Sequence, residues 1–379
     1  MEKKKIAFDG QLFLQDKKTG IDWYAYYMIK NLSQKDKFSC IINVFTKEHL
    51  TRLSEMEQWG CKLQLCKKIS AFWYKLISQV IPLSYSRFFL DEVNATVFFS
   101  YLIPPDVKGK KIVFIHDMAY KAYPSTVDRK TKWRLRSQLK ISCRRADKII
   151  TVSEFSKQEV IKYLKISESK IEVVPAGVDL TVYHPNYTIK QWEQIKRKYR
   201  LPEEYFLYLG TIEPRKNILK MIEAYKRALD EKKLPVLVIA GKKGWMYEEV
   251  FEKVKKWDLQ DKIIFTGYIK ADEAPILLGK AKVFLFPSLY EGFGMPVIEA
   301  MACGTPVITS NTTSLQEIAK DAAILVNPND IEEIKNAMEN IVIEDFSWLI
   351  EKGVERAKQY TWEKSALKFE KILERIIKS

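Results

Sequence analysis

Two glutamates, Glu291 and Glu299, bracket a Gly-Phe-Gly turn in the otherwise apolar stretch PSLYEGFGMPVIEAMACGTPVITS. Pro296 suits the first turn of a short helix, so the Gly-Phe-Gly turn is expected at a helix N-terminus. Backbone N–H groups at that position, together with the helix dipole, favour phosphate. A carboxylate repels phosphate but accepts hydrogen bonds from sugar hydroxyls. Phosphate and sugar hydroxyls together describe a nucleotide sugar; the plainer alternative is a glycine turn between two solvated glutamates.

A second signal for an anion lies in YFLYLGTIEPRKN, where the chain leaves a strand at Gly210 and enters a helix near Asn217. Arg215 and Lys216 therefore follow the carboxyl end of a strand, and adjacent cations repel each other unless an anion joins them. We interpret them as a diphosphate site, with a solvated basic loop as the alternative. The sequence contains no D-x-D motif, so neither a metal site nor a cofactor is predicted.

His116 is one of only three histidines, and it closes the strand-like run KIVFIHD, followed directly by Asp117. The carboxyl end of a buried strand is an active-site position in parallel sheets. The pair is therefore a candidate for a second part of the site. A hydrogen-bonded structural histidine is the alternative.

Short β-branched runs alternate with helical patterns along both halves of the chain. Those of the first half are KIAFDG, CIINVFT, ATVFFS, KIVFIHD, KIITVS and KIEVVP, and those of the second are YFLYLG, VLVIAG, KIIFTG, VFLFPS and PVITS. Strands alternating with helices predict parallel βαβ units, so the expected fold class is α/β, with two Rossmann-like, doubly wound sheets. Ligands bind beyond the carboxyl ends of such strands, and two facing sheets would leave a central cleft for the chemistry.

The length of 379 residues also suggests two domains. The stretch VVPAGVDLTVYHP, residues 173–185, carries Pro, Gly and Asp between two strand–helix series, as a crossing between domains should. We therefore expect one domain over residues 1–186 and the other over 187–361.

Positive charge is concentrated in the first half of the chain. Residues 1–186 carry 32 Lys and Arg against 19 Asp and Glu, whereas the remainder carries 31 against 29. A helix starting near Asp128 would place four cations on one face: Lys132, Arg136, Lys140 and Arg144. We expect this face to bind an anionic lipid surface or a lipid-diphosphate acceptor, with a merely solvated face as the alternative.

The sequence predicts a cytoplasmic protein that is at most peripheral to a membrane. No leader peptide precedes the strand-like IAFDG. The longest apolar stretch, residues 69–90, is interrupted by Lys75, Pro82 and Arg87, so it lacks about 20 uninterrupted apolar residues for a span. The five cysteines are odd in number and lack metal-like spacing, so we expect them to be reduced.

Five separated motifs together resemble a known family. The run from Glu291 to Glu299, with seven residues between the two glutamates, occurs with GTIEPRKN, FTGYI, FIHD and ITVSEFSK. This set is similar to the retaining GT-B glycosyltransferases of glycosyltransferase family four, in particular to mannosyltransferase-like members, and covers nearly the whole chain. The resemblance implies an acceptor-binding first domain, a donor-binding second domain, and a final helix, about 362–379, that crosses back to the first domain.

The resemblance also implies roles for single residues on the donor side. Arg215 and Lys216 would hold the donor diphosphate, Glu299 the ribose hydroxyls and Glu291 the transferred sugar, while His116 would line the sugar pocket. The other implied donor-binding residues are Gly210, then Gly267 and Ile269 beside the nucleobase, and Gly292, Phe293, Gly294 and Met295 of the turn.

The first-half glycine loop departs from the family pattern. Many relatives read like TGIGRY, but this chain has Thr19-Gly20-Ile21-Asp22-Trp23-Tyr24, so an acid and an aromatic residue replace a glycine and a cation. A phosphate contact from this loop is therefore in doubt. We expect Gly20, Asp22, Trp23 and Asp117 to shape the acceptor pocket instead.

The predicted function is a retaining, metal-independent transfer of a hexose from a nucleotide sugar to a glycan or lipid-linked acceptor, in surface polysaccharide or glycolipid synthesis. GDP-mannose is the first expectation for the donor, with UDP-linked sugars as alternatives. A departing nucleoside diphosphate needs charge stabilisation, for which Arg215 and Lys216 are candidates. The resemblance implies same-face displacement, and the sequence leaves a double displacement through Glu291 open.

Two other classes of function compete with this prediction. A catalytically idle partner subunit would share the fold, but it should have lost Lys216, Glu291 or His116, and none is lost. A polyanion or nucleic-acid binder is favoured by the basic run DRKTKWRLRSQLKISCRRADK, which lacks a recognisable nucleic-acid-reading motif. We therefore expect no nucleic-acid partner.

Overall fold

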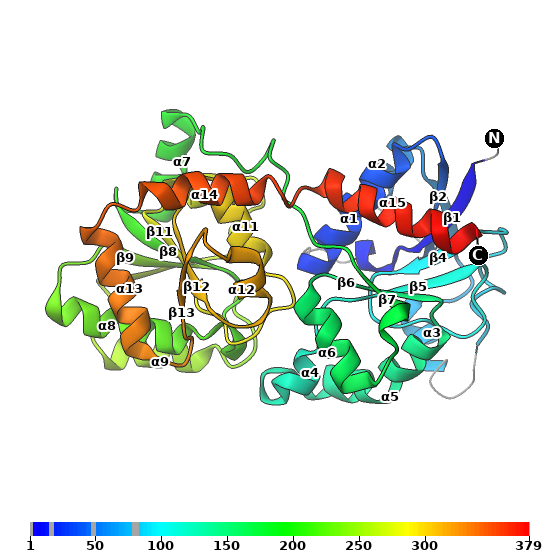
Figure 1. The fold of residues 1–379 in the computed structure, drawn as a ribbon, viewed down its shortest axis with the longest axis horizontal. Helices are drawn as coiled ribbons and strands as arrows, with labels where there is room; N and C mark the ends of the chain where they lie inside the picture. Colours follow the sequence, from blue (N-terminus) through cyan, green and yellow to red (C-terminus); the bar gives the residue numbers. More distant parts are fainter. Residues whose placement is uncertain (1–2, 15–18, 47–50, 78–82, 379) are drawn as a thin grey trace. The chain divides into compact units, whose positions relative to one another are not determined.

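The computed structural model describes residues 3–14, 19–46, 51–77 and 83–378. The chain forms two compact units, each built on one parallel sheet (Figure 1). The first unit combines Met1–Met118, Arg129–Ala176 and Trp362–Ser379, and the second combines Ala119–Asp128 with Gly177–Thr361. The chain thus enters the second unit ahead of Asn186, where the sequence suggested the boundary, because Val178 already pairs with Thr361.

The sheet of the first unit has seven parallel strands in the order β3-β2-β1-β4-β5-β6-β7. Their bounds are Lys62–Cys66 (β3), Phe38–Phe45 (β2), Lys4–Asp9 (β1), Ala95–Phe98 (β4), Lys110–Ile115 (β5), Lys148–Thr151 (β6) and Ile171–Val173 (β7). The central strands are buried on both faces, as expected for a parallel sheet covered by helices.

The sheet of the second unit has six parallel strands in the order β10-β9-β8-β11-β12-β13. Their bounds are Ile263–Gly267 (β10), Val236–Ala240 (β9), Tyr205–Leu209 (β8), Val283–Phe286 (β11), Val307–Ser310 (β12) and Ile324–Val326 (β13). The predicted fold class of two doubly wound parallel sheets is therefore confirmed.

Two strands of these sheets were absent from the sequence prediction, and both are edge strands. β3 is partly exposed along its length, and β13 is only three residues long. An edge strand needs neither two apolar faces nor a long β-branched run, so its sequence signal is weak.

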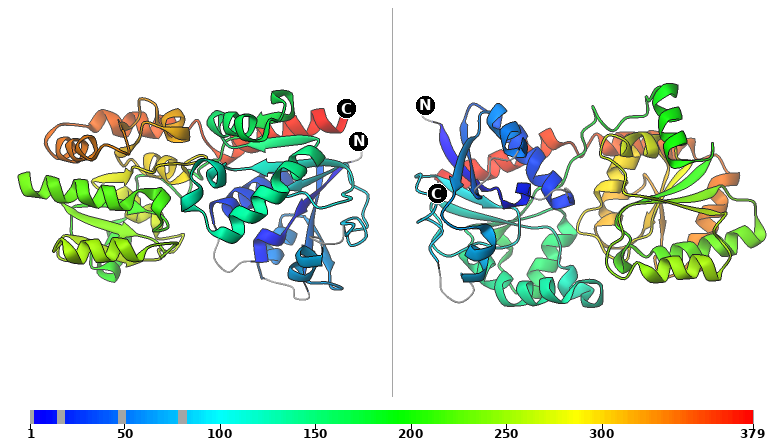
Figure 2. Two further views of the ribbon diagram at one scale, coloured as in Figure 1. Left: turned by 90° about the horizontal axis from the view of Figure 1, so that it is seen from below. Right: turned by 180° about the vertical axis from the view of Figure 1, so that it is seen from behind.

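Helices cover both faces of each sheet (Figure 2). In the first unit they are α1 (Gly20–Ser33), α2 (Thr51–Gln58), α3 (Ala71–Ile77), α5 (Arg129–Arg145), α6 (Glu154–Leu164) and α15 (Trp362–Lys378). In the second they are α7 (Ile189–Tyr199), α8 (Ile218–Glu231), α9 (Glu248–Lys256), α10 (Ala274–Lys280), α11 (Met295–Ala302), α12 (Thr313–Ala319), α13 (Ile331–Ile343) and α14 (Ser347–Ala357). The short helix α4 (Ala119–Ala122) also belongs to the second unit.

The last helix, α15, packs against α1 in the first unit (Figure 1). Trp362 at its start is buried and stacks on Tyr27 of α1, with 4.9 Å between ring centroids. Tyr24 contacts the same indole edge-on at 5.4 Å. These aromatic contacts bind the C-terminal helix to α1 of the first unit, although the residues just before it belong to the second unit.

None of the helices in the described part of the chain is both long enough and apolar enough to cross a bilayer. The apolar stretch over 69–90 begins with α3, and its residues 78–82 lie outside the described ranges. All five cysteines are buried and unpaired, as expected for reduced thiols.

Candidate active site

The sheet of the second unit reverses its winding between β8 and β11. From β8 the chain continues to β9 and β10 on one side, and from β11 it continues to β12 and β13 on the other. Connections leaving neighbouring strands in opposite directions open a crevice at their carboxyl ends, the usual ligand position in such sheets. Arg215 and Lys216 follow β8, and Glu291 follows β11, so the sequence-predicted residues lie at this point.

Arg215, Lys216 and Glu291 are in direct contact. The Lys216 ammonium donates to Glu291 Oε1 at 2.5 Å, and Arg215 Nη1 donates to Glu291 Oε2 at 2.9 Å. Arg215 Nη1 also reaches the carbonyl of Tyr290 at 2.7 Å, and its Nη2 pairs with Glu213 at 2.8 Å. The anion that joins the two cations is thus a carboxylate of the chain itself, whereas the sequence argument expected a phosphate.

Because the cluster is buried, the charge of each member strongly affects the pKa values of the others. The Glu291 side chain is only 9% exposed, and desolvation alone would raise its pKa. The charges of Arg215 and Lys216 outweigh that effect and lower the pKa of Glu291 to about 2. The pKa of Lys216 is lowered by burial and by Arg215, against the attraction of Glu291. Glu291 is therefore a fully ionised, weakly basic carboxylate at neutral pH.

The turn after Glu291 leads into α11 as the sequence predicts. Gly294 precedes the helix with a φ of 102°, and a Cβ there would lie 2.5 Å from a methyl group of Leu315. Glycine is required on both counts. Gly292 and Phe293 are buried, whereas Met295, the first helical residue, is partly exposed. In the first turn of α11, Pro296 has no N–H and Val297 donates to the carbonyl of Gly294 at 3.0 Å, so the attraction of this end for an anion rests on the N–H of Met295 and on the helix dipole.

Glu299 lies one turn into α11 and is half-buried. Burial raises its pKa to about 7, and a hydrogen bond with Tyr183 opposes the rise only in part. The two bracketing glutamates thus differ sharply: Glu291 is held ionised by two cations, whereas Glu299 titrates near neutral pH.

Three glycines bring the ends of β8, β9 and β10 close together. Gly241 has a φ of 151°, and a Cβ there would lie 1.8 Å from the carbonyl oxygen of Gly210. The N–H of Gly210 donates to Ala240, and that of Gly241 donates to Gly267. Gly267 ends β10 with a φ of 72° at a shift in register, and Ile269 beyond it is buried. The predicted Gly210 and Gly267 therefore lie on either side of Gly241, at the carboxyl ends of β8 and β10.

Several residues that support the site had not been singled out from the sequence. Asn217 is buried with a φ of 61°, and its amide donates to the carbonyls of Pro287 and Pro328. The Ser314 hydroxyl lies 2.9 Å from the carbonyl of Glu291 and 3.0 Å from that of Phe293. The asparagine at the loop-to-helix junction was a readable signal for a left-handed residue, since Asn tolerates that conformation. Ser314, distant in sequence, offered none.

His116 lies in the first unit, directly after β5, and is buried. Its Nε2 lies 2.9 Å from the carbonyl of Phe99, so the ring donates there and keeps Nδ1 as an acceptor. Burial lowers the pKa of His116 to about 4, only partly offset by Phe99 and Asp117. The histidine is therefore neutral at pH 7, and Asp117 beside it is half-buried.

The residues predicted for the acceptor loop form the start of α1 in the first unit. Gly20 is its exposed first residue, and Asp22 is buried, with Oδ2 accepting from the N–H and hydroxyl of Thr19 at 2.6 and 2.8 Å. Asp22 thus closes a capping box, a structural role that its spacing from Thr19 would have indicated. Trp23 packs on Tyr26 and Tyr27. Their roles toward an acceptor stay predictions.

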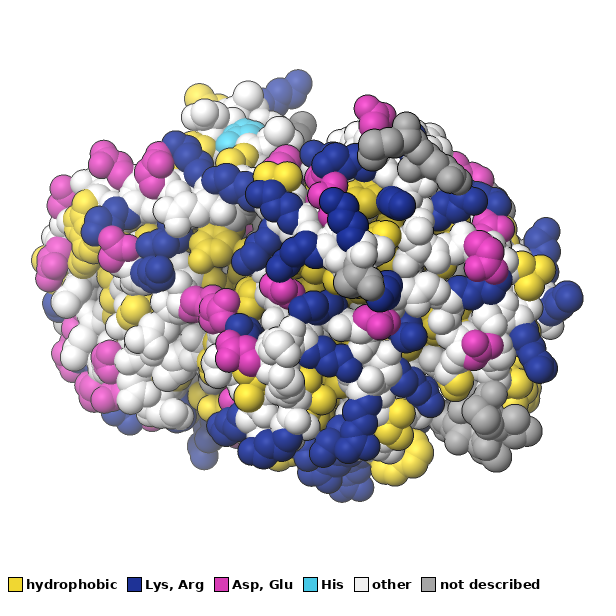
Figure 3. Space-filling view, turned by 45° about the vertical axis from the view of Figure 1, so that its right-hand side comes forward, with side chains coloured by type: hydrophobic (Ala, Val, Ile, Leu, Met, Phe, Trp, Pro, Cys, Tyr) yellow, Lys and Arg dark blue, Asp and Glu magenta, His cyan; other side chains and the backbone are white. Residues whose placement is uncertain are grey.

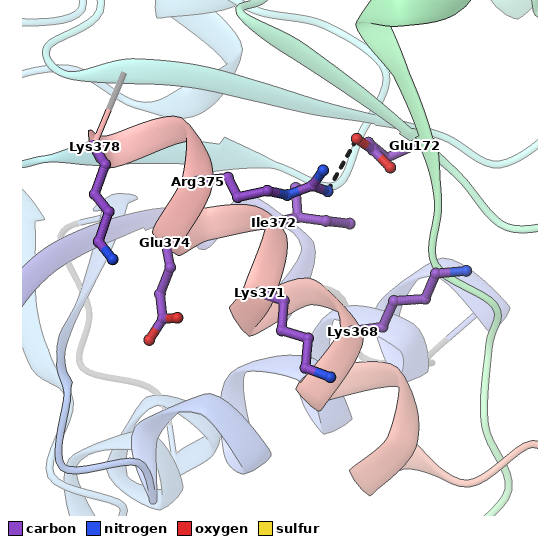
Figure 4. Close-up of a pocket in the computed structure, with 7 residues that line it drawn as sticks. All are labelled: Glu172, Lys368, Lys371, Ile372, Glu374, Arg375 and Lys378. Atoms are coloured by element: carbon purple, nitrogen blue, oxygen red, sulfur yellow. Dashed lines mark hydrogen bonds and ion pairs between the residues drawn. The ribbon is translucent and has the colours of Figure 1, made fainter.

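A groove of about 440 Å³ runs along α15 beside β7 in the first unit (Figure 4). It is lined by Glu172, Lys368, Lys371, Ile372, Glu374, Arg375 and Lys378. Its two acids are engaged, Glu172 by Arg375 at 3.1 Å and Glu374 by Lys37 at 2.9 Å. None of the residues predicted from the sequence lines this groove.

Comparisons with known proteins agree with this geometry. Residues 190–361 match the family model described as glycosyl transferases group 1, and residues 93–182 match that of glycosyltransferase family 4. O-antigen chain mannosyltransferase B of Escherichia coli is 32% identical over 260 residues, which cover 67% of each chain. The serotype-specific mannosyltransferase WbdA of Escherichia coli is 32% identical over 227 residues, 59% of this chain but only 28% of WbdA.

Solved structures show the same fold. HepE of Anabaena, determined in complex with UDP and glucose, superposes with a TM-score of 0.75 at 15% identity, covering 98% of this chain and all of HepE. The chain therefore belongs to the glycosyltransferases of group 1 and family 4, and it is a glycosyltransferase with the GT-B fold.

Proposed function

We propose that the protein transfers mannose from GDP-mannose to a glycan or lipid-linked acceptor, with retention of anomeric configuration and without a metal ion. The observation that carries this proposal is the buried Arg215–Lys216–Glu291 cluster at the β8/β11 crevice, beside the N-terminus of α11. The names of the relatives support mannose and O-antigen polysaccharide, and the UDP-glucose complex of HepE supports a nucleotide sugar.

The cluster suggests how the donor would be received. Without a donor, Glu291 occupies the cations, which would otherwise repel each other in a buried place. We propose that the donor diphosphate takes over Arg215 and Lys216, assisted by the positive end of the α11 dipole. Glu291 is then released to accept hydrogen bonds from the hydroxyls of the sugar. Glu299, one turn along the same helix, would accept those of the ribose.

Charge stabilisation of the departing diphosphate is the main chemical task in this proposal. Arg215 and Lys216 are fixed cations in a buried site, where such groups stabilise developing charge most strongly. The leaving group is already an acceptable one, so no acid is needed to protonate it. The two cations and the helix N-terminus are the only groups that the proposal requires for neutralising the diphosphate, which is why we propose no metal.

We propose retention by same-face displacement, as the family resemblance implies. In the structure Glu291 is bound to two cations and its pKa is about 2, so it is a weakly basic carboxylate that needs new hydrogen-bond donors once the diphosphate has taken over these cations. We therefore propose that it holds the sugar, while a departing phosphate oxygen takes the proton of the acceptor hydroxyl. His116, neutral at pH 7, would contact the sugar as a hydrogen-bonding group and would not act as an acid.

Calorimetry with a panel of nucleotide sugars tests the proposal directly. GDP-mannose is expected to bind more tightly than UDP-glucose or UDP-galactose, and GDP is expected to retain most of the affinity. Preference for a UDP-linked sugar would change the donor but keep the reaction class. Binding of no nucleotide at all would contradict the proposed function.

Turnover has to be measured alongside binding, because an idle partner subunit would also bind a donor. Release of GDP in the presence of mannose-terminated glycans, with and without EDTA, is expected to be equal. Activity that EDTA abolished and Mg²⁺ or Mn²⁺ restored would contradict metal independence. The anomeric configuration of the product, read by NMR, separates retention from inversion.

A further inference from the structure

The outer face of α5 combines exposed cations with exposed large apolar side chains. Trp133 is 63% exposed and Ile141 is 47% exposed, and their spacing of eight residues places them on one side of the helix. The opposite side docks on the first unit through three buried side chains, Leu135, Leu139 and Cys143. The exposed apolar residues are therefore not part of the core.

Cations surround these two residues. Lys130, Arg134, Arg136, Lys140 and Arg144 are all exposed, and the sequence from 129 to 146 contains no acid. Among the residues that the structure describes, no ion pair joins any of these five cations to a carboxylate. Figure 3 shows dark blue Lys and Arg side chains gathered with apolar ones at the lower edge of the view, where α5 lies in Figure 1.

Within the described structure, no carboxylate pairs with the five cations of this face, and Trp133 and Ile141 remain exposed. Clustered like charges on a surface attract a surface of opposite charge. Tryptophan between cations is the composition of helices that lie in the headgroup region of a bilayer, with the aromatic ring at the boundary of the acyl chains. A nucleic acid would satisfy the cations but would leave Ile141 exposed to water.

We propose that this α5 face, made of Trp133, Ile141 and the five surrounding cations, docks the protein on an anionic lipid bilayer by inserting Trp133 and Ile141 between headgroups. Two apolar side chains thus contribute to membrane binding in addition to the positive charges. This mode of docking does not depend on which nucleotide sugar is the donor. A lipid-linked acceptor would reside in the same surface.

The test is co-sedimentation of the full chain with vesicles of phosphatidylcholine, with and without phosphatidylglycerol. Binding is expected only to the anionic vesicles, and it should fall as salt is raised. Trp133→Ser together with Ile141→Ser is expected to weaken binding on the order of tenfold while leaving its dependence on salt unchanged. Lys140→Glu with Arg144→Glu is expected to weaken binding on the order of 10- to 100-fold.

Matched controls come from the second unit. Trp348 on α14 is 45% exposed, so Trp348→Ser removes a similar side chain from another surface. Lys255→Glu with Lys256→Glu on α9 makes the same change in net charge. Both controls should bind like the parent, and all variants alter exposed residues, so equal melting temperatures are expected.

Three results would overturn the inference. They are equal binding to neutral and anionic vesicles, equal weakening by the control variants, and binding to duplex DNA but not to vesicles. Donor binding by calorimetry should be unchanged in every variant, so this test and that of the proposed function fail independently.

Discussion

The basic residues of this protein occupy two contrasting environments. Five cations of α5 (Lys130, Arg134, Arg136, Lys140 and Arg144) are exposed, and among the described residues no ion pair joins any of them to a carboxylate. Arg215 and Lys216 are largely buried, and each is held by a carboxylate at hydrogen-bonding distance. Exposed charges are screened and interact weakly one by one, whereas buried charges cannot be left unpaired. In the first unit these residues therefore contribute a positive surface potential. In the second unit, Arg215 and Lys216 are held at fixed positions by hydrogen-bonded ion pairs.

This contrast predicts that removing a cation has very different effects in the two places. No single one of these five exposed α5 cations should matter to turnover, since no carboxylate in the described part of the chain holds any of them in place. In the buried cluster, one cation should decide whether the site works. Five predictions for the buried residues follow from this contrast, from the largest expected effect to the smallest.

Lys216→Ala should cause the largest loss. It removes one of the two cations that hold Glu291 and, in the proposed function, the diphosphate, so turnover should fall on the order of 100- to 1,000-fold and nucleotide affinity should also fall. Lys220→Ala is the matched control, because Lys220 lies on α8 with an exposed contact to Asn329. Single-turnover rates and calorimetry measure both effects. Equal losses in the two variants would mean that burial of the cluster is irrelevant to function.

Glu291→Gln should separate binding from turnover. The amide no longer competes as an anion for Arg215 and Lys216, so a nucleoside diphosphate should bind the variant at least as tightly as the parent, while turnover falls. The variant should also be less stable, by about 3 to 5 kcal/mol, because two buried cations lose their partner. Weaker nucleotide binding with unchanged turnover would contradict the proposed exchange of partners.

Acid should weaken the same cluster in the parent. The pKa of Glu291 is about 2 in the folded protein and 4.5 ordinarily, so its ionised form is favoured by folding. The stability from this group is therefore complete above pH 4.5 and is lost as the pH falls towards 2. Urea unfolding of parent and Glu291→Gln between these limits should show a difference that shrinks with acid.

Glu299 should give a smaller, opposite dependence on pH. Its pKa is raised to about 7, so the folded state favours the protonated form, and the stability from this group is lost as the pH rises from 4.5 through 7. If its carboxylate accepts ribose hydroxyls, nucleotide affinity should rise up to about tenfold between pH 6 and 8 and level off above. Calorimetry on Glu299→Gln should show weak binding without this dependence. A parallel rise in the variant would assign the titration to another group.

His116 should show the smallest effect. Its pKa is about 4 in the folded protein and 6.5 ordinarily, so folding favours the neutral ring. The stability it contributes is complete above pH 6.5 and is lost as the pH falls from 6.5 to 4. NMR should find the ring uncharged at pH 5.5, and turnover should show no step near pH 6.5 from this residue. A protonated ring at pH 5.5 would show that His116 is better hydrated than its burial in the structure indicates.

Much of the fold could be predicted from the sequence because the central strands of a parallel sheet have a distinctive composition. Central strands such as Ile112–Ile115 are buried on both faces and must be continuously apolar, so their runs are unmistakable. β3 and β13 were missed because edge strands escape that requirement. The chain changes units between Ala176 and Gly177, which lies within the turn-rich stretch 173–185 but ahead of the expected boundary at Asn186.

The candidate site was readable only as a set of residue types at strand ends. Arg215, Lys216 and Glu291 were identified because loops after β8 and β11 meet at the switch in strand order. The contact of Glu291 with Arg215 and Lys216 could not be predicted from the sequence. We had expected the two cations to bind the phosphates of a ligand, not a carboxylate of the same chain. Ser314 was missed because its hydrogen bonds to the carbonyls of Glu291 and Phe293 leave no local pattern in the sequence. The position of Asn217 could have indicated a left-handed residue, but not its hydrogen bonds to the carbonyls of Pro287 and Pro328.

The sequence by itself determined the two α/β units, the glycine turn before α11, the concentration of positive charge in the first half and the residues at the strand ends. All of these features can be recognised from the residue types of short segments, because each depends on residues that are close together in the sequence. Only the tertiary structure decided that Glu291 bridges Arg215 and Lys216, that Glu299 and His116 have shifted pKa values, and that Trp133 remains exposed. Burial and long-range contact set those properties, and both arise only when segments far apart in sequence are packed together.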